Sequence, residues 1–304
     1  MGTPAFAVPS LERTVAAGHE VVAVFTQPDR PKGRGQKDAV SPVKEAALRL
    51  VLGVYQPERV RRPEVVEQLR AMAPEAMVVV GYGQIIPKVI LDIPPLGIIN
   101  LHASLLPKYR GAAPIQWAIA RGETYTGVTT MRINEGLDTG DMLLKWETAI
   151  GPEENAVELG KRLAVAGAEL LVRTLAELPA IPSQPQDDSQ ATYAPILKKE
   201  DGLIHWTQSA FAIERRVRGF QPWPNAYTSF NSKGLTIWGA DPTDNPNSDG
   251  APGQVIVADR NDLVVSCGEQ TALRLVEVQP EARKRIPVRD FINGMHLKVG
   301  DHFG

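Results

Sequence analysis

The stretch LGIINLHASLLPKYRGAAPIQWAIARG, residues 96–122, runs through a strand, a loop and a helix in succession. Residues 96–102 are largely apolar up to Asn100, and such a run predicts a buried strand. Residues 113–122 predict a helix that ends at a glycine. Because side chains alternate across a strand, Asn100 and His102 point to the same face at its carboxyl end.

The alternation of strands and helices continues on both sides of this stretch. Apolar runs predict buried strands at 20–26 and 76–83, and helical patterns are found at 41–51 and 154–178. Strands that alternate with helices indicate parallel pairing. We therefore predict an α/β fold with a doubly wound, mostly parallel, Rossmann-like sheet in the first half of the chain.

Two serines are predicted to cap helices. Ser41 precedes Pro42, and a serine followed by proline at the first helical position is a strong start signal. Ser10 precedes the helical pattern of residues 11–17 and is assigned the same role.

The beginning of the chain departs from the pattern of such sheets. Residues 2–10 resemble the loop between a first strand and a first helix, yet only Met1 precedes them. A doubly wound domain has its first strand near the sheet centre. We therefore expect a sheet that lacks its first strand, either because the sequence starts inside a longer protein or because Met1 is genuine and the strand is dispensed with.

The composition changes in the second half. Residues 181–197 are rich in Pro, Gln, Ser and Asp, which is typical of a linker. We expect it to join a first domain at 1–180 to a second domain at 198–304. Short strand candidates separated by turn signals in the second domain predict a small β-barrel or a twisted sheet.

Charge and cysteine content restrict the function classes. The net charge is -2, and residues 198–304 hold 13 Lys and Arg against 13 Asp and Glu, so any contact with nucleic acid must come from local patches. The single Cys267 excludes an internal disulfide and a Cys-based zinc site, and it is typical of a reducing cytoplasm. The five histidines are scattered, so no metal site is predicted. No apolar run reaches the ~18 residues of a membrane span.

Three polar side chains are candidates for chemistry. Asn100 offers a donor to a developing oxyanion, and His102 can donate or move a proton near neutral pH. Asp138 lies between two glycines in NEGLDTGD, residues 134–141, where a carboxylate can orient His102 or accept a proton. Taken singly, each residue also fits a structural role, as a satisfied polar group or a turn-forming Asp.

The segment SLLP, Ser104–Pro107, follows His102 directly. Its peptide groups can hydrogen-bond a planar polar ring while Leu105 and Leu106 cover the faces of that ring. The alternative is a simple loop that leads into the helix at 113–122.

Taken together, these motifs resemble a known family. NLHASLLPKYRGAAPI followed by EGLDTGD is similar to the signature of the 10-formyltetrahydrofolate-dependent formyltransferases. GTPAFAVPSL, GYGQIIP, GFQPWPNAYT and VQPEARKRIPVRDFINGMHLKVGD resemble the members of that family that act on methionyl-tRNA. The resemblance covers nearly the whole chain, except for an apolar strand that family members carry before GTP.

The resemblance implies a reaction and its partners. The formyl group would pass from 10-formyltetrahydrofolate, a co-substrate, to the α-amino group of methionine on initiator tRNA, for translation initiation. The second domain would be an oligonucleotide-binding-like (OB-like) β-barrel that touches the tRNA. A cytoplasmic enzyme without a metal, acting as a monomer, is expected.

The resemblance also implies site residues. Asn100, His102 and Asp138 would form the catalytic triad. Arg34, in the basic loop of residues 27–40, would contact the tRNA. The folate would be bound at Ser104, Leu105, Leu106 and Pro107, and at Gln84 and Ile86 of the segment GYGQIIP.

Other functions remain open from the sequence. A nicotinamide-dependent dehydrogenase would need G-x-G-x-x-G after its first strand, and GTPAFAV lacks that pattern. A 10-formyltetrahydrofolate hydrolase or another folate-dependent formyltransferase would use the same triad. The hydrolase would release formate, and the other transferase would pass the formyl group to a different acceptor, so neither would need methionyl-tRNA. A non-catalytic RNA-binding protein would keep every activity after loss of Asn100 or Asp138, and would lose RNA affinity with Arg34.

Overall fold

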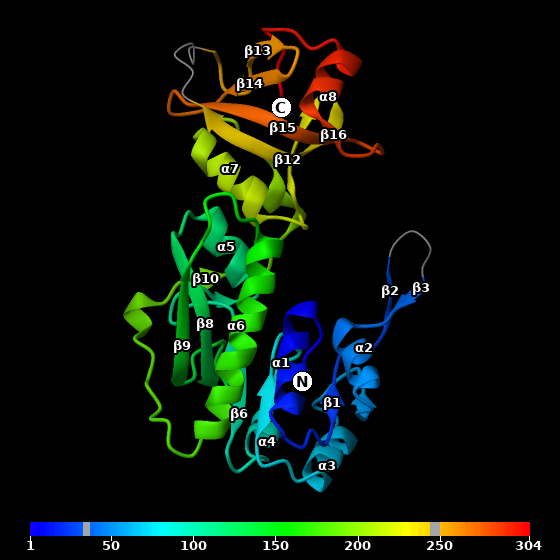
Figure 1. The fold of residues 1–304 in the computed structure, drawn as a ribbon, viewed down its shortest axis with the longest axis vertical. Coiled ribbons are helices and arrows are strands. Elements are labelled where there is room, and N and C mark those ends of the chain that lie inside the picture. The colour runs from blue at the N-terminus through cyan, green and yellow to red at the C-terminus, as the bar shows by residue number, and fades with distance from the viewer. Residues whose placement is uncertain (33–36, 244–249) are drawn as a thin grey trace. The chain divides into compact units, whose positions relative to one another are not determined.

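The computed structural model describes residues 1–32, 37–243 and 250–304 of the chain (Figure 1). The chain forms two compact units. The N-terminal unit comprises Met1–Pro114, Tyr125–Thr148 and Gly160–Ala194, and the C-terminal unit comprises Ile115–Thr124, Ala149–Leu159 and Pro195–Gly304. Within the described ranges, no helix has the length and apolar character needed to span a membrane.

The central sheet of the N-terminal unit has four strands in the order β5-β6-β8-β9. Their bounds are β5 (Met77–Val79), β6 (Ile98–His102), β8 (Tyr125–Arg132) and β9 (Met142–Ala149). β5 and β6 are parallel, whereas β6 and β8 are antiparallel. The predicted mostly parallel sheet is thus corrected to a mixed one. β8 and β9 follow each other through a short loop, which leaves no room for the crossover helix that parallel neighbours require.

The first residues of the chain join this sheet to a second parallel pair, β1 (Val24–Phe25) with β4 (Val54–Tyr55). The N–H of Gly2 donates to the carbonyl of Phe25 at 2.9 Å, and the N–H of Val80 donates to that of Met1 at 2.9 Å. The α-amino group of Met1 donates to the carbonyl of Val78 at 2.6 Å, and its burial lowers the pKa of this amino group to about 5. A cavity of about 500 Å³ lies beside these first residues and is lined mainly by aliphatic side chains.

Helices cover both faces of the sheet. On one face, Met77, Val79 and Ile98 pack in one cluster with side chains of α3 (Pro63–Ala71) and α4 (Lys88–Leu91). On the other face, Ile99 packs with Leu171 and its neighbours on the long helix α6 (Ala156–Glu177), which runs along the sheet in Figure 1. Alternate residues of β6 therefore face different helices, and the even-numbered ones, Asn100 and His102 included, point away from α6.

The remaining elements of the N-terminal unit are short. They are the 3-10 turns η1 (Ala5–Ala7) and η2 (Asp188–Gln190), helices α1 (Val8–Ala16) and α2 (Pro42–Arg49), and the strand pairs β2 (Arg30–Lys32) with β3 (Lys37–Ala39) and β7 (Arg110–Gly111) with β10 (Tyr193–Ala194). Ser41 caps α2 as predicted, since its side chain accepts from the N–H of Lys44 at 3.1 Å. The predicted cap Ser10 is wrong, because α1 begins earlier, after Ala7.

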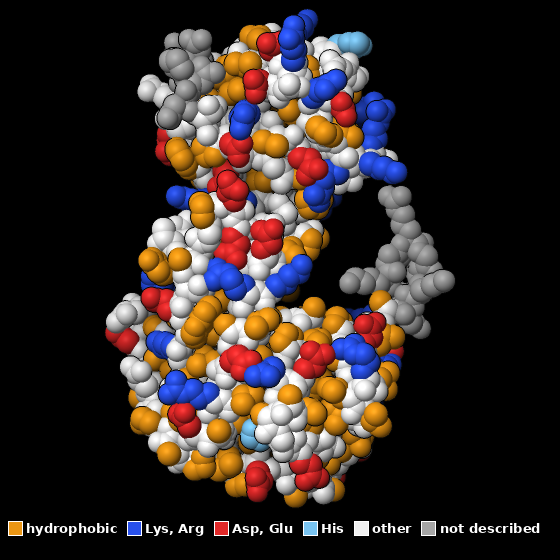
Figure 2. Space-filling view, viewed as in Figure 1, with side chains coloured by type: hydrophobic (Ala, Val, Ile, Leu, Met, Phe, Trp, Pro, Cys, Tyr) orange, Lys and Arg blue, Asp and Glu red, His pale blue; other side chains and the backbone are white. Residues whose placement is uncertain are grey.

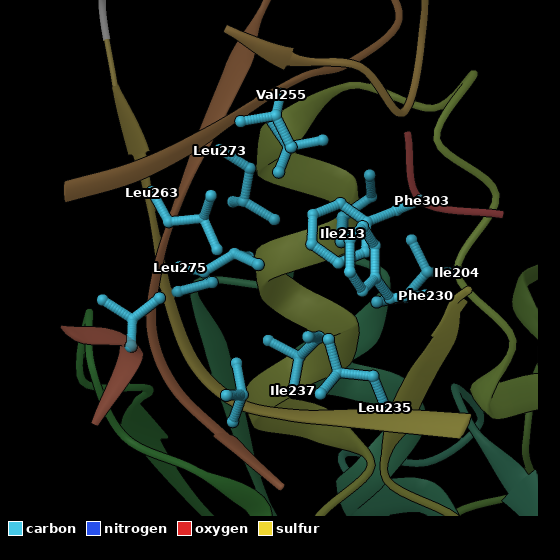
Figure 3. Close-up of a cluster of buried hydrophobic side chains, with 14 of the residues drawn as sticks. Ile204, Ile213, Phe230, Leu235, Ile237, Val255, Leu263, Leu273, Leu275 and Phe303 are labelled. Carbon is cyan, nitrogen blue, oxygen red and sulfur yellow. The ribbon is translucent and has the colours of Figure 1, made fainter. Parts of the chain in front are cut away.

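The C-terminal unit is an antiparallel sheet packed against a helix. Its strands are β11 (Ala226–Phe230), β12 (Lys233–Thr243), β13 (Val255–Asp259), β14 (Asp262–Ser266), β15 (Ala272–Pro280) and β16 (Ile286–Pro287), and its helices are α5 (Pro114–Ala120), η3 (Lys199–Gly202), α7 (Ala210–Gly219) and α8 (Val288–Met295). Ile213 of α7 lies in the middle of the aliphatic and aromatic core shown in Figure 3. Leu273 and Leu275 of β15 pack in this core, and so do the rings of Phe230 and Phe303.

The strands of the expected OB-like β-barrel form an open sheet, so the barrel is not closed. The strand order is β11-β12-β15-β14-β13, and in the described part of the chain β11 and β13 are not paired with each other. The last residues of the chain lie against both end strands instead. The N–H of Val255 donates to the carbonyl of Asp301 at 2.8 Å, and the N–H of Gly304 donates to that of Ser229 at 3.1 Å. The tail thus occupies the edge groups that would otherwise close the barrel.

Candidate active site

Asn100 and His102 lie at the carboxyl end of β6, which is buried over its whole length. Asn100 is opposite Met131 and His102 is opposite Thr129 on β8. The exposed fractions of the two residues are 9% and 6%. Polar side chains buried to this degree normally have hydrogen-bond partners. For Asn100, the described residues supply none to the amide, so its donors are available.

The imidazole of His102 contacts groups from two loops. Its Nε2 lies 2.8 Å from the carbonyl oxygen of Tyr109. A carbonyl only accepts, so Nε2 carries a proton. Its Nδ1 lies 3.7 Å from Oδ2 of Asp138, which is just beyond hydrogen-bond range.

Asp138 lies at the turn of the loop between β8 and β9. Its φ is 52°, a left-handed conformation that few residues other than glycine adopt. Its Oδ2 accepts a hydrogen bond of 2.8 Å from the N–H of Gly111. A Cβ at the nearby Gly140 would lie 1.8 Å from the carbonyl oxygen of Arg132, so only glycine fits there. The glycines of NEGLDTGD thus permit the tight loop that brings Asp138 to His102.

The segment Ser104–Pro107 is held by polar side chains from the neighbouring strands. Oγ1 of Thr129 donates to the carbonyl of Ser104 at 2.7 Å and accepts from the N–H of Leu106 at 3.2 Å. Nζ of Lys145 donates to the carbonyl of Leu106 at 2.6 Å. Burial lowers the pKa of this lysine. The segment therefore has a defined shape beside the triad candidates.

The two leucines of this segment differ in burial. Leu106 is 1% exposed and packs in a cluster with Met131 and Met142. Its side chain is thus part of the core. Leu105 is only half-buried, so it is the leucine of the pair that retains accessible apolar surface.

Gln84 and Ile86 have structural contacts in the segment after β5. The amide of Gln84 accepts from the N–H of Val60 at 2.7 Å and donates to the carbonyl of Pro57 at 3.1 Å. Ile86 is buried in the cluster that includes α3. Ile85 between them is 89% exposed. The accessible parts of this segment are therefore its backbone and the side chain of Ile85.

The predicted tRNA contact Arg34 lies outside the described residues, between strands β2 and β3. In the C-terminal unit, the guanidinium of Arg285 lies 3.6 Å from the ring centroid of Trp238 and 3.2 Å from the carboxylate of Glu277. Figure 2 shows Lys and Arg side chains next to Asp and Glu on the visible face of this unit. Residues 198–304 hold equal numbers of the two kinds of charged residue.

The structure adds residues that the sequence did not single out. Tyr109 accepts from His102, and Gly111 donates to Asp138. Arg110 between them is 2% exposed, and its Nε donates to Oε1 of Gln186 at 3.0 Å. Arg110 and Gly111 follow the quoted strand by only a few residues, which was a usable signal. Gln186 lies in the stretch whose composition predicted a linker, so nothing in the sequence pointed to it.

Comparison with known families and proteins gives a consistent result. Residues 1–175 match the family described as formyl transferase, and residues 196–296 match the formyl transferase C-terminal domain. The methionyl-tRNA formyltransferase of Solibacter usitatus is 64% identical over all of this chain and 97% of its own length. The methionyl-tRNA formyltransferase of Koribacter versatilis is 56% identical over the same shares.

Solved structures with the same fold are more distant in sequence. An N-formyltransferase from Helicobacter canadensis, in complex with folinic acid and dTDP-3-aminofucose, superposes with a TM-score of 0.65 at 18% identity, over 92% of this chain and 97% of its own. The sugar 3N-formyl transferase WlaRD, in the presence of dTDP and 5-N-formyl-THF, has a TM-score of 0.65 at 19% identity, over 93% and 97%. At these identities the likeness shows the fold.

Proposed function

The chain belongs to the formyl transferase family, and on that premise we propose how its residues transfer a formyl group to methionyl-tRNA. The full-length relatives are methionyl-tRNA formyltransferases, and this is the activity of the chain. The donor is a formylated folate, which we assign as 10-formyltetrahydrofolate, and the acceptor is initiator tRNA. The observation that carries the proposal is the approach of Asp138 Oδ2 to His102 Nδ1, at 3.7 Å, beside the available amide of Asn100.

The reaction needs charge stabilisation and proton transfer. The α-amino nitrogen of methionine attacks the formyl carbon, a C–N bond forms, and the carbonyl oxygen takes the electron pair as an oxyanion. Collapse of this intermediate breaks the bond from the formyl carbon to N10 of the folate. The amine loses one proton, and N10 gains one. No covalent bond to the enzyme is required.

The three site residues divide these tasks. Asn100 donates from its amide to the oxyanion, because its donors are unengaged and lie on the same face as the imidazole. His102 carries one proton on Nε2, which donates to the carbonyl of Tyr109, and if Nδ1 is protonated as well, the ring is a second donor to the oxyanion. Asp138 orients the imidazole and accepts the proton of the amine, directly or through a water molecule.

The remaining assignments follow from the neighbouring segments. The folate ring is placed at Ser104–Pro107, with the backbone of residues 84–86 on its other side. Support comes from the defined shape of the first segment and from the exposed Ile85 of the second. We assign Arg34 and the domain at 198–304 to the tRNA, with a catalytic domain at 1–180 and a linker at 181–197.

The proposal is tested by replacing Asp138 and measuring transfer of labelled formyl to methionyl-tRNA. Asp138→Asn keeps the size of the side chain and removes its charge and its capacity to accept a proton. We expect kcat to fall by about 10²–10⁴-fold, the range for loss of a general base. Glu135→Gln is the matched control, because Glu135 is an exposed carboxylate in the same loop, and its kcat should be unchanged.

A wild-type kcat in Asp138→Asn would refute the assigned mechanism. Release of formate without transfer in the wild-type protein would indicate a folate hydrolase instead. Both outcomes are visible in the same assay when product formyl-methionyl-tRNA and free formate are counted separately.

A further inference from the structure

The loop that carries Asp138 needs external support. Its central residues 134–137 are exposed, and Asp138 itself has a left-handed backbone. Within the loop, Oδ1 of Asn134 accepts from the N–H of Gly136 and from the hydroxyl of Thr139. These bonds shape the turn but do not attach it to the body of the unit. The position of the carboxylate relative to His102 therefore depends on contacts from elsewhere.

Gln186 supplies such contacts. Its amide nitrogen donates to the carbonyl of Asp138 at 2.8 Å and to the carbonyl of Gly140 at 2.7 Å. The two acceptor carbonyls flank Thr139, so the two bonds hold the backbone at Asp138 and directly after it. We propose that Gln186 is a positioning residue, which sets the distance between the Asp138 carboxylate and His102. The inference rests on the proposed function, in which that carboxylate acts with the imidazole.

Arg110 determines which way the Gln186 amide points. Its guanidinium only donates, so the atom of Gln186 that lies 3.0 Å from its Nε is the amide oxygen. The amide nitrogen is then directed at the two loop carbonyls. Arg110 is buried, and its Nη2 also pairs with Asp188 at 2.7 Å. A buried guanidinium with fixed partners is a rigid support.

The segment around Gln186 is itself fastened to the sheet. Gln184 exchanges two backbone hydrogen bonds of 2.9 Å with Met142, the first residue of β9. At the other end, β10 pairs with β7, in which Arg110 and Gly111 lie. Residues 184–194 thus form a strap, attached at both ends, and the Gly111 N–H that holds the Asp138 carboxylate belongs to the same β7.

The strap matters because the distance between His102 Nδ1 and Asp138 Oδ2 is close to the limit of a hydrogen bond. A separation of 3.7 Å between Nδ1 and Oδ2 becomes a hydrogen bond after a movement of less than ~1 Å, and is lost after a similar movement outward. Misplacement of catalytic groups by ~1 Å costs up to about 10²-fold in rate. Loss of Gln186 is therefore expected to act on the chemical step and not on substrate binding.

The test compares Gln186→Met with wild type and with Gln190→Met. Met keeps the length of Gln and removes the amide, and Gln190 is an exposed strap residue whose amide bonds Asp187, so it serves as the matched control. We expect kcat of Gln186→Met to fall about 10–100-fold with KM for both substrates within about threefold. Gln190→Met should equal wild type. Gln186→Glu retains the acceptor for Arg110 and loses the donors, so it should show the same loss in kcat with the strap still attached.

A double mutant separates positioning from general support. If Gln186 acts through Asp138, adding Gln186→Met to Asp138→Asn lowers kcat no further. Additive losses, or wild-type kcat in both Gln186 variants while Asp138→Asn is impaired, would overturn this inference alone. Wild-type kcat in Asp138→Asn would overturn the proposed function first.

Discussion

The two units of the molecule bury different kinds of side chain. In the C-terminal unit the described core is aliphatic and aromatic, and its buried polar residues are Thr228 and Ser266, each with a hydrogen-bond partner. The N-terminal unit has apolar clusters on both faces of its sheet and, in addition, a polar group at the end of β6. This group comprises Asn100, His102, Ser104, Arg110 and Thr129, while the other buried polar residues of the unit, Ser10, Thr26, Thr126, Thr130 and Thr174, are small hydroxyl residues outside it.

The difference shows that the buried amide, imidazole and guanidinium groups gather at the candidate site, whereas the buried polar residues elsewhere in the two units are Ser and Thr. A core that only has to hold a sheet against a helix minimises polar groups, because each one needs a partner. The end of β6 retains polar groups in a buried position, where water does not weaken their hydrogen bonds and charges. The stability of the C-terminal unit should therefore depend on volume, and that of the N-terminal site on hydrogen bonds.

The largest effect on stability is expected from a cavity in the C-terminal core. Leu275 is 1% exposed, and Leu275→Ala should lower the free energy of unfolding of this unit by about 2–5 kcal/mol. Val276, 43% exposed on the same strand, is the control, and Val276→Ala should change it by less than about 0.5 kcal/mol. Cys267 reports on this unit, since burial raises the pKa of its thiol to about 12 and a thiol reagent reacts only on unfolding. Equal labelling of both variants in urea would contradict the role assigned to packing.

A smaller effect is expected from a hydrogen bond at the site. Thr129→Val is close to isosteric and leaves the N–H of Leu106 and the carbonyl of Ser104 without their partner. We expect a loss of about 1–3 kcal/mol in the free energy of unfolding and a severalfold rise in KM for the formyl donor. Thr129→Ser keeps the hydroxyl and should stay near wild type. If the Val and Ser variants behave alike in calorimetry and kinetics, the hydroxyl does not support the segment.

The smallest expected effect is a gain in stability, not a loss. Ser10 is 2% exposed, and its hydroxyl has no hydrogen-bond partner among the described residues. Ser10→Ala removes an unsatisfied polar atom and improves helix propensity, so thermal unfolding should shift upward by an amount equivalent to about 1 kcal/mol. Ser10→Thr keeps the hydroxyl and should not gain. A lower midpoint for Ser10→Ala would mean that the hydroxyl is hydrogen-bonded and stabilises the N-terminal unit.

Local signals predicted much of the N-terminal fold. The apolar run at residues 96–102 identified β6, the alternation of side chains along a strand gave the common face of Asn100 and His102, and the Ser41–Pro42 pair identified the start of α2. The mixed pairing was not predicted, because an apolar run looks the same in a parallel and an antiparallel position. The cap at Ser10 failed because the preceding 3-10 turn leads directly into α1, which moves the helix start toward the N-terminus.

The candidate site was predictable in part. Residue types and glycine spacing pointed to Asn100, His102 and Asp138, because those features follow from local backbone geometry. Gln84 and Ile86 were selected by segment, and only the tertiary structure shows that their side chains have contacts within the unit itself.

The sequence by itself determined the features that depend on local physics: which residues alternate along β6, and where glycine permits the loop of Asp138. It also showed the family to which the motifs are similar. Only the tertiary structure decided the parts that depend on distant segments. Gln186 lies 48 residues from Asp138 in the chain, yet it holds the Asp138 loop. Hydrogen bonds between such segments form only after the sheet has brought them together, so no periodicity or composition in either segment records them.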